Sequence, residues 1–146
     1  MLKVLIAEDN IIKQKNIKKM LKENGIDYKL VETYSDCWKT IYYEYDEFDA
    51  LILDMSLPRF KNEEPYKFAG YDILKHLYYK NINLPVIILT GHVQFRVDNN
   101  IYDLESLTNL IKENDRITNS DIVKYDNKSK AWQHKIINFI KSRKIE

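Results

Sequence analysis

The sequence predicts an α/β protein in which helices cover both faces of a parallel sheet. Short runs of branched apolar residues recur along the chain, and segments with helical spacing of apolar side chains lie between them. Parallel strands that are buried on both faces have this continuously apolar character. Strict alternation of such strands with helices favours a doubly wound, three-layer sandwich. We therefore expect a single domain over residues 1–146.

Five segments are expected to form the strands of the sheet. They are rich in Val, Ile and Leu and are bounded by polar or turn residues: 4–7, 28–33, 50–53, 86–89 and 122–123. The second reads as an edge strand, and Pro85 opens the fourth. The fifth is the weakest, because only Ile122 and Val123 are apolar.

Five helices are expected after these strands. Apolar residues at helical spacing place them near 11–24, 35–45, 70–79, within 102–111, and 128–143. Ser35 is expected to cap the second of these helices. The first carries Ile17, Met20 and Leu21 on one face and ends at Asn24-Gly25. The lysines around that face, Lys13 among them, are expected to form a solvated surface.

Composition limits the classes of function. The chain has 146 residues, is 45% hydrophobic and carries a formal net charge of +1, which gives no support for direct nucleic-acid binding. Its apolar runs are far shorter than the roughly 20 residues that cross a bilayer, so no membrane segment is expected. The single cysteine, Cys37, and the absence of a leader-like N-terminus favour a cytoplasmic location.

Polar side chains follow the strands where each one ends. Glu8 and Asp9 follow the first strand, Asp54 the third, Thr90 ends the fourth, and Lys124 follows the fifth. Ligands of open α/β sheets bind at the carboxyl ends of the strands, so these side chains are expected to converge. Three carboxylates in one place imply a divalent metal ion, and the lysine implies an anion.

With these residues in order, the chain resembles the receiver domain of bacterial two-component response regulators. The matching motifs are Val4-Leu5-Ile6-Ala7-Glu8-Asp9-Asn10, Leu51-Ile52-Leu53-Asp54-Met55-Ser56-Leu57-Pro58, Gly70-Tyr71-Asp72-Ile73-Leu74, Pro85-Val86-Ile87-Ile88-Leu89-Thr90-Gly91 and Lys124. The resemblance implies a flavodoxin-like strand order with the site at the topological switch point.

The resemblance also implies the chemistry of the site. Asp54 is expected to be the phosphoacceptor. Mg²⁺ is expected to be the cofactor, bound by Asp9, Asp54 and the backbone carbonyl of Ser56, with Glu8 acting directly or through a water molecule.

Three further residues are given roles by the same resemblance. Lys124 is expected to pair with a phosphoryl or Asp54 oxygen, and Thr90 to donate its hydroxyl to the phosphoryl group. Gly91, which lacks a Cβ, would let a backbone N–H approach the same oxygens.

The expected partners are proteins. A histidine kinase or a phosphotransfer protein would supply the phosphoryl group, and the lysine-rich first helix is where such a partner docks in this family. The output is expected to be a contact with a downstream protein target, without an enzymatic activity of the chain's own.

The chain departs from the family pattern in two segments, 55–69 and 91–121, which are longer than usual. They form either a lid or partner-specific surface, or insertions that the fold tolerates. Asp121 stands at the position of the aromatic switch residue and Tyr125 at that of a proline. His92 is a candidate neighbour of the phosphoryl pocket.

Two other functions remain open. One is an interaction module that keeps the receiver fold and does not rely on phosphorylation. The other is a hydrolase with an aspartyl nucleophile, which is disfavoured because such enzymes need an acidic residue two positions after the nucleophile, where this chain has Ser56.

Overall fold

A computed structural model gives the fold and describes residues 1–91, 94–97, 99–113 and 120–142, with the side chains of 95–97 and 111–113 left aside. Its centre is a five-stranded parallel sheet of order β2-β1-β3-β6-β9. The strands are β1 (Lys3–Ala7), β2 (Asp27–Val31), β3 (Ala50–Leu53), β6 (Val86–Thr90) and β9 (Ser120–Lys124). This is the doubly wound, flavodoxin-like order that was predicted.

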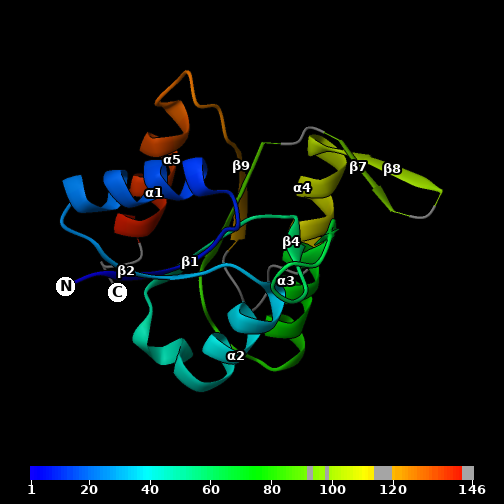
Figure 1. Ribbon diagram of the computed structural model, residues 1–146, viewed down its shortest axis with the longest axis horizontal. Helices are drawn as coiled ribbons and strands as arrows, with labels where there is room; N and C mark the ends of the chain where they lie inside the picture. The colour runs from blue at the N-terminus through cyan, green and yellow to red at the C-terminus, as the bar shows by residue number, and fades with distance from the viewer. Residues whose placement is uncertain (92–93, 98, 114–119, 143–146) are drawn as a thin grey trace.

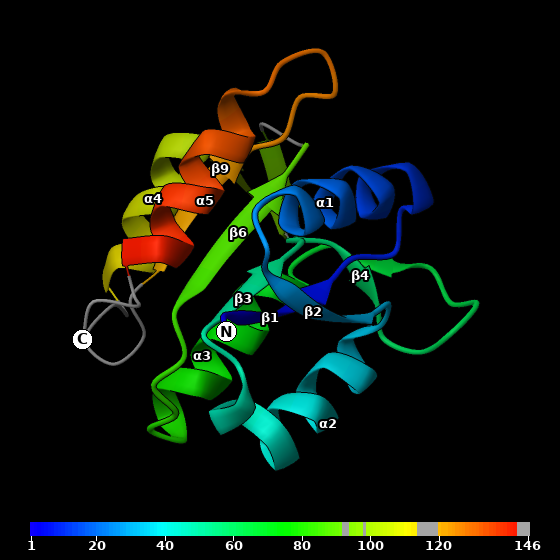
Figure 2. The ribbon, with the colours of Figure 1, turned by 90° about the vertical axis from the view of Figure 1, so that its left-hand side faces the viewer.

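Helices cover both faces of the sheet, as Figures 1 and 2 show. Helices α1 (Ile11–Glu23) and α5 (Ala131–Ser142) lie on one face. Helices α2 (Tyr34–Glu44), α3 (Ala69–Tyr79) and α4 (Leu104–Glu113) lie on the other, and a short 3-10 turn, Tyr45–Glu47, follows α2. In Figure 2, α1 and α2 lie on opposite sides of β1 and β2.

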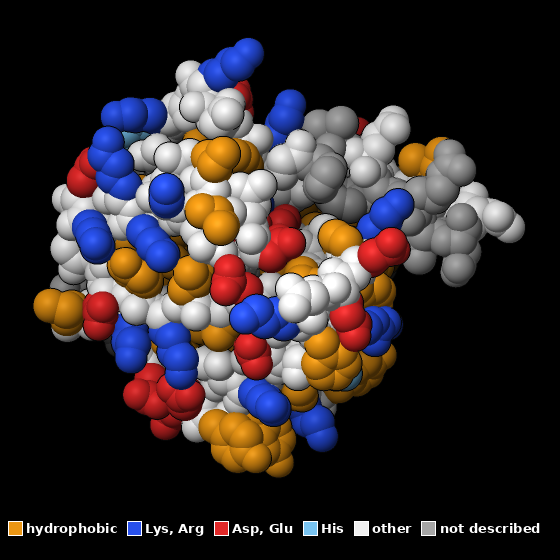
Figure 3. Space-filling view, in the orientation of Figure 1, with side chains coloured by type: hydrophobic (Ala, Val, Ile, Leu, Met, Phe, Trp, Pro, Cys, Tyr) orange, Lys and Arg blue, Asp and Glu red, His pale blue; other side chains and the backbone are white. Residues whose placement is uncertain are grey.

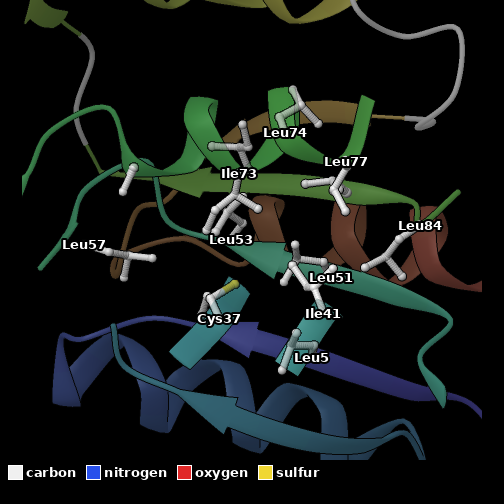
Figure 4. Packing of buried hydrophobic residues seen from close by; sticks show 14 of the residues in the cluster. Leu5, Cys37, Ile41, Leu51, Leu53, Leu57, Ile73, Leu74, Leu77 and Leu84 are labelled. Atoms are coloured by element: carbon white, nitrogen blue, oxygen red, sulfur yellow. The ribbon is translucent and has the colours of Figure 1, made fainter. Parts of the chain in front are cut away.

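The sheet separates two hydrophobic cores because successive side chains of a strand point to opposite faces. Leu5, Leu51 and Leu53 face α2 and α3, where Figure 4 shows them packed against the helix side chains. Ile6 and Ile52 face α1 and α5. Each strand therefore contributes to both cores, which explains why β1 and β3 read as unbroken apolar runs.

The two long segments each contain a hairpin. In the first, β4 (Leu57–Pro58) pairs antiparallel with β5 (Pro65–Tyr66). In the second, β7 (Gln94–Val97) pairs antiparallel with β8 (Asn100–Asp103), and Figure 1 shows this hairpin extending away from the five-stranded sheet. Neither hairpin was predicted from the sequence.

The first hairpin packs onto the body of the protein. Tyr66 donates a hydrogen bond from its hydroxyl to Asp72 of α3, and the guanidinium carbon of Arg59 lies 4.1 Å from the centre of the Tyr66 ring. The backbone N–H of Ser35 donates to the carbonyl of Arg59. Met55 and Leu57 are fully buried. The segment 55–69 is therefore an ordered part of the α2/α3 face.

Several local predictions need correction. Thr33, not Ser35, caps α2, because its hydroxyl accepts the backbone N–H of Asp36. Tyr102 belongs to β8 and packs against Phe68, so the fourth helix begins only at Leu104.

The remaining differences concern bounds and exposure. The fifth strand is longer than predicted because Ser120 and Asp121 also pair with β6. His76 is half-buried against Trp38, at 5.0 Å between ring centroids, whereas His134 is exposed. Among the described residues, no helix is long and apolar enough to cross a membrane.

Candidate functional site

Three carboxylates meet at the carboxyl ends of β1 and β3. The strands pair in parallel with Ala7 opposite Leu53, so the residues that follow, Glu8 and Asp54, leave the sheet side by side. Together with Asp9 they form the acidic cluster, in which one oxygen from each carboxylate lies within 4.8 Å of the others. The side chains of Glu8 and Asp54 are only 2% and 12% exposed. The predicted convergence of these three residues is present.

The start of α1 is organised by the same cluster. Asn10 caps the helix by accepting the backbone N–H of Lys13 at 2.9 Å, and its own N–H donates to Glu8 Oε2 at 3.0 Å. The Gln14 amide donates to the Glu8 carbonyl at 2.8 Å. The first turn of α1 is thereby fixed against the end of β1.

Lys13 points from this first turn into the acidic cluster. Its Nζ lies 2.7 Å from Glu8 Oε1 and 3.3 Å from Asp54 Oδ1, and it donates to the carbonyl of Leu89 at 2.6 Å. The side chain is only 8% exposed. The prediction that Lys13 belongs to a solvated lysine face is therefore wrong for this residue.

Burial dominates the electrostatics of the two carboxylates at the end of β1. Burial is the main cause that raises the pKa of Glu8 to about 8; the nearby charge of Asp54 acts in the same direction, and Lys13 opposes both. Burial also raises the pKa of Asp9. Both carboxyls would gain from an added cation, because the charged form is the one that burial penalises.

The residues fit a hard divalent cation. Asp54 Oδ1 is buried and accepts no hydrogen bond, because the 3.3 Å approach of Lys13 is an ion pair without hydrogen-bond geometry. An unsatisfied buried oxygen beside two further carboxylates is the all-oxygen donor set that Mg²⁺ prefers. The half-buried Ser56 follows Asp54 closely enough for its backbone carbonyl to belong to the same turn.

Gly70 holds the backbone of that turn. Its N–H donates to the carbonyl of Met55 at 2.9 Å. A Cβ at this position would lie 2.8 Å from the carbonyl oxygen of Asp54 and 2.9 Å from the Met55 Cα. Only glycine therefore allows α3 to begin so close to the turn that carries Asp54 and Ser56.

The β9 side of the site is more open. Thr90 is fully buried and pairs in register with Lys124, as the two strand ends were predicted to do. Lys124 itself is exposed, and within the described residues no ion pair joins it to Asp54. Gly91 is exposed, and a Cβ there would meet nothing within 4 Å. His92 lies outside the described residues.

A cavity of about 280 Å³ opens at the acidic cluster. Its lining residues come from the ends of four strands, β1, β3, β6 and β9, and from the start of α1: Glu8, Asn10, Ile12, Lys13, Asp54, Gly91, Tyr125 and Asn127. The hairpin of β4 and β5 contributes none of them. This part of the enlarged segment therefore does not act as a lid over the cavity in the described structure.

Tyr125 lines the cavity together with Asp54. Its ring centre lies 5.5 Å from Lys13 Nζ, and its hydroxyl accepts a hydrogen bond from Asn16 at 2.7 Å. The ring also packs against Trp132, at 5.0 Å between centroids. Tyr125 thus replaces the small proline of the family pattern with a side chain that reaches α1.

Sequence reasoning missed Lys13, although a signal was present. Lys13 lies on the same helical stripe as Ile17, Met20 and Leu21, at spacings of i, i+4, i+7 and i+8, and all four residues are buried. A lysine that continues the core stripe of a helix toward a group of strand-end carboxylates is expected to turn inward.

Comparison with known proteins agrees with this geometry. The response regulator receiver domain family matches residues 4–124. The Detocs response regulatory protein DtcB of Enterobacter cloacae is 30% identical over 121 residues, which cover 77% of this chain and 78% of that protein.

Solved structures share the fold. The receiver domain of a Francisella response regulator matches with a TM-score of 0.69 at 23% identity, over 99% of this chain and 98% of that one. A response regulator receiver domain protein from Clostridium thermocellum matches with a TM-score of 0.67 at 21% identity, over 99% and 98%. Because the family match spans most of the sequence and the sheet has the flavodoxin-like strand order, this chain belongs to the response regulator receiver domain family of two-component systems.

Proposed function

We propose that the chain accepts a phosphoryl group on Asp54 in a Mg²⁺-dependent reaction with a histidine kinase or a phosphotransfer protein. The observation that carries this proposal is the buried Asp54 oxygen without a hydrogen bond, which lies close to the carboxylates of Glu8 and Asp9 and beside a cavity that Asp54 lines. A carboxylate in this state is available both as a ligand and as a nucleophile.

The transfer itself is a displacement at phosphorus. A carboxylate oxygen of Asp54 forms a bond to phosphorus while the P–N bond of a phosphohistidine breaks. The bonding pair stays with the imidazole nitrogen, which takes up a proton, and an acyl phosphate remains on Asp54. Mg²⁺, held by Asp9, Asp54, the Ser56 carbonyl and, directly or through water, Glu8, would offset the negative charge of the transferred group.

The β9 side would then sense the new group. The Thr90 hydroxyl would donate to a phosphoryl oxygen, and the exposed Lys124 would turn inward to pair with another. Their movement would change the surface around α4 and β9, where a downstream protein target would bind.

The partner surface is proposed on α1. Figure 3 shows lysine side chains gathered on the side of the molecule that carries α1, and Lys15 and Lys19 are exposed there. An exposed basic helix next to the phosphoacceptor suits an acidic protein surface. We place this exchange in the cytoplasm, within a single domain and without an enzymatic activity of the chain's own.

Intact-mass measurement tests this function. The protein is incubated with Mg²⁺ and acetyl phosphate or phosphoramidate. The expected result is the gain of one phosphoryl group by the wild type and none by Asp54→Asn, which preserves the size of the side chain. No gain on the wild type, or an equal gain on both proteins, would refute the assignment of Asp54.

A second function is favoured by one observation, namely the ammonium group of Lys13 between Glu8 and Asp54. A site that already contains a cation could serve a receiver-fold interaction module that does not rely on phosphorylation. Calorimetric titration with Mg²⁺ separates the two functions. Heat of binding that disappears in Asp9→Asn supports the phosphoacceptor, and no binding to the wild type at millimolar Mg²⁺ supports the interaction module.

A further inference from the structure

We propose that Lys13 is the resident cation of the acidic cluster, and that Mg²⁺ binds in competition with its charge. The inference rests on the proposed Mg²⁺ site of the phosphoacceptor and adds an element of regulation to it. In this arrangement Lys13 of α1, and not Lys124 of β9, neutralises Asp54 in the metal-free protein.

The contacts of the ammonium group carry the proposal. The ammonium group donates to the Leu89 carbonyl at 2.6 Å and forms ion pairs with Glu8 Oε1 at 2.7 Å and Asp54 Oδ1 at 3.3 Å. These oxygens come from the ends of three adjacent strands, β1, β6 and β3. Lys13 therefore connects the ends of these three strands through its ammonium group.

The surrounding structure holds Lys13 in this position. Its backbone is fixed by the Asn10 cap, and the ring of Tyr125 lies 5.5 Å from Nζ on the cavity side. Tyr125 is itself held by the hydrogen bond from Asn16, one turn further along α1. The lysine thus has an aromatic face over it, which also favours a cation.

The charges determine how Mg²⁺ and Lys13 affect each other. The acidic cluster carries three carboxylates, and Lys13 is the only lysine or arginine of the described residues that forms an ion pair with any of them. A metal ligated by Asp54 would lie close to the ammonium, and the repulsion of two cations in a buried place is strong. When Mg²⁺ binds, Lys13 therefore either moves out of the acidic cluster or stays there and lowers the affinity of the site for Mg²⁺.

The two lysines near the site differ in a way that makes the proposal specific. Lys13 is buried and paired, whereas Lys124 is exposed and forms no ion pair with Asp54 in the described structure. Removal of the Lys13 charge should therefore raise the affinity of the site for Mg²⁺, and removal of the Lys124 charge should leave that affinity unchanged.

Calorimetric titration of the phosphate-free protein with MgCl₂ tests the inference. The variants are Lys13→Met, Lys124→Met and Lys15→Met, the last an exposed lysine of the same helix that matches the change in net charge. Lys13→Met is expected to bind Mg²⁺ at least about tenfold more tightly than the wild type, and the two controls to stay within about twofold of it. Equal or weaker binding by Lys13→Met, or equal tightening by Lys124→Met, would overturn the proposal.

A second pair of variants covers the case in which Lys13→Met does not fold without metal. Lys13→Gln keeps a polar side chain without the charge, and Lys13→Arg keeps the charge. Competition predicts tighter Mg²⁺ binding for Lys13→Gln only, whereas a purely steric role of the lysine would leave Lys13→Gln and Lys13→Arg equal and would contradict it.

The same titrations separate this inference from the proposed function. If no variant binds Mg²⁺, the proposed metal site itself fails, and the inference fails with it. If the wild type and Lys13→Met bind Mg²⁺ equally, only the role of Lys13 is lost. Phosphoryl transfer to Asp54 is measured independently and does not enter either result.

Discussion

The two sides of the site are built differently. On the α1 side, Glu8, Lys13 and Asp54 are packed together with little exposure and short contacts. On the β9 side, Thr90 is buried at the end of its strand, but Lys124 and Gly91 are exposed. One side is packed and paired before any ligand arrives, and the other places the exposed Lys124 at its edge.

This difference suggests a division of labour. Groups that must bind a metal ion gain from a fixed arrangement, because no ordering has to occur when the ligand arrives. A group that responds to a newly bound phosphoryl group must be able to adopt two positions, one before and one after phosphorylation. Lys13 belongs to the first side by its contacts, and Lys124 suits the second by its exposure.

The largest expected effect comes from Lys13 in metal-free buffer. Lys13→Met leaves the buried Glu8 and Asp54 without their cation, which should lower the free energy of unfolding by about 3 kcal/mol. Urea unfolding with excess chelator measures this change. Addition of Mg²⁺ should restore more stability to Lys13→Met than to the wild type.

The matched change on the other side is Lys124→Met. Its expected cost is below about 0.5 kcal/mol, because the residue is exposed. If both variants lose the same stability, the two sides of the site are not built differently, and the comparison fails.

Substitution of two glycines, one on each side of the site, compares how tightly the backbone is packed on the two sides. Gly70→Ala places a Cβ against the carbonyl of Asp54 and should cost about 2 kcal/mol, with weaker Mg²⁺ binding because the turn of Ser56 must shift. Gly91→Ala meets nothing and should leave the stability of the unphosphorylated protein within about 0.5 kcal/mol. Thermal unfolding and Mg²⁺ titration of both variants measure these effects, and equal losses would show that the turn after Asp54 is not tightly packed.

The last comparison concerns pH. Burial raises the pKa of Glu8 to about 8 in the folded protein, above its ordinary value of 4.5. In the range between these values the folded state binds more protons than the unfolded state, so stability is full below the lower value and is lost as pH rises through the higher one.

Metal-free wild type should therefore lose stability by on the order of 1 kcal/mol for each pH unit between about pH 5 and about pH 8. Glu8→Gln cannot ionise and should show a flatter profile, with only the smaller contribution of Asp9 remaining. Denaturant unfolding across this range provides the measurement. Parallel profiles for the two proteins would mean that Glu8 is ionised throughout, with Lys13 outweighing its burial.

Much of the fold could be predicted because local patterns and the global structure agree. The strands β1, β3 and β6 are buried on both faces, so their unbroken apolar runs identify them. Strand order and the meeting of Glu8, Asp9 and Asp54 followed from the resemblance and from strand-end placement.

The hairpins β4-β5 and β7-β8 could not be predicted from periodicity, since strands of two to four residues are too short to show it. The position of Lys13 was missed for a different reason. A lysine on an amphipathic helix is usually solvated, and this general expectation outweighed the position of Lys13 on the core stripe, so its contacts with Glu8, Asp54 and the Leu89 carbonyl were not foreseen. Lys124 was expected near Asp54, and its exposed position makes that contact a proposal for the phosphorylated state.

The central claim is that Asp54 is the residue that carries the phosphoryl group. Its most direct test is to phosphorylate the protein with acetyl phosphate and Mg²⁺, reduce the acyl phosphate with borohydride, and locate the reduced side chain by peptide mass spectrometry. The account predicts reduction at Asp54 and only when Mg²⁺ is present. Reduction at Glu8 or Asp9 instead, or the same yield at Asp54 in excess chelator, would contradict it.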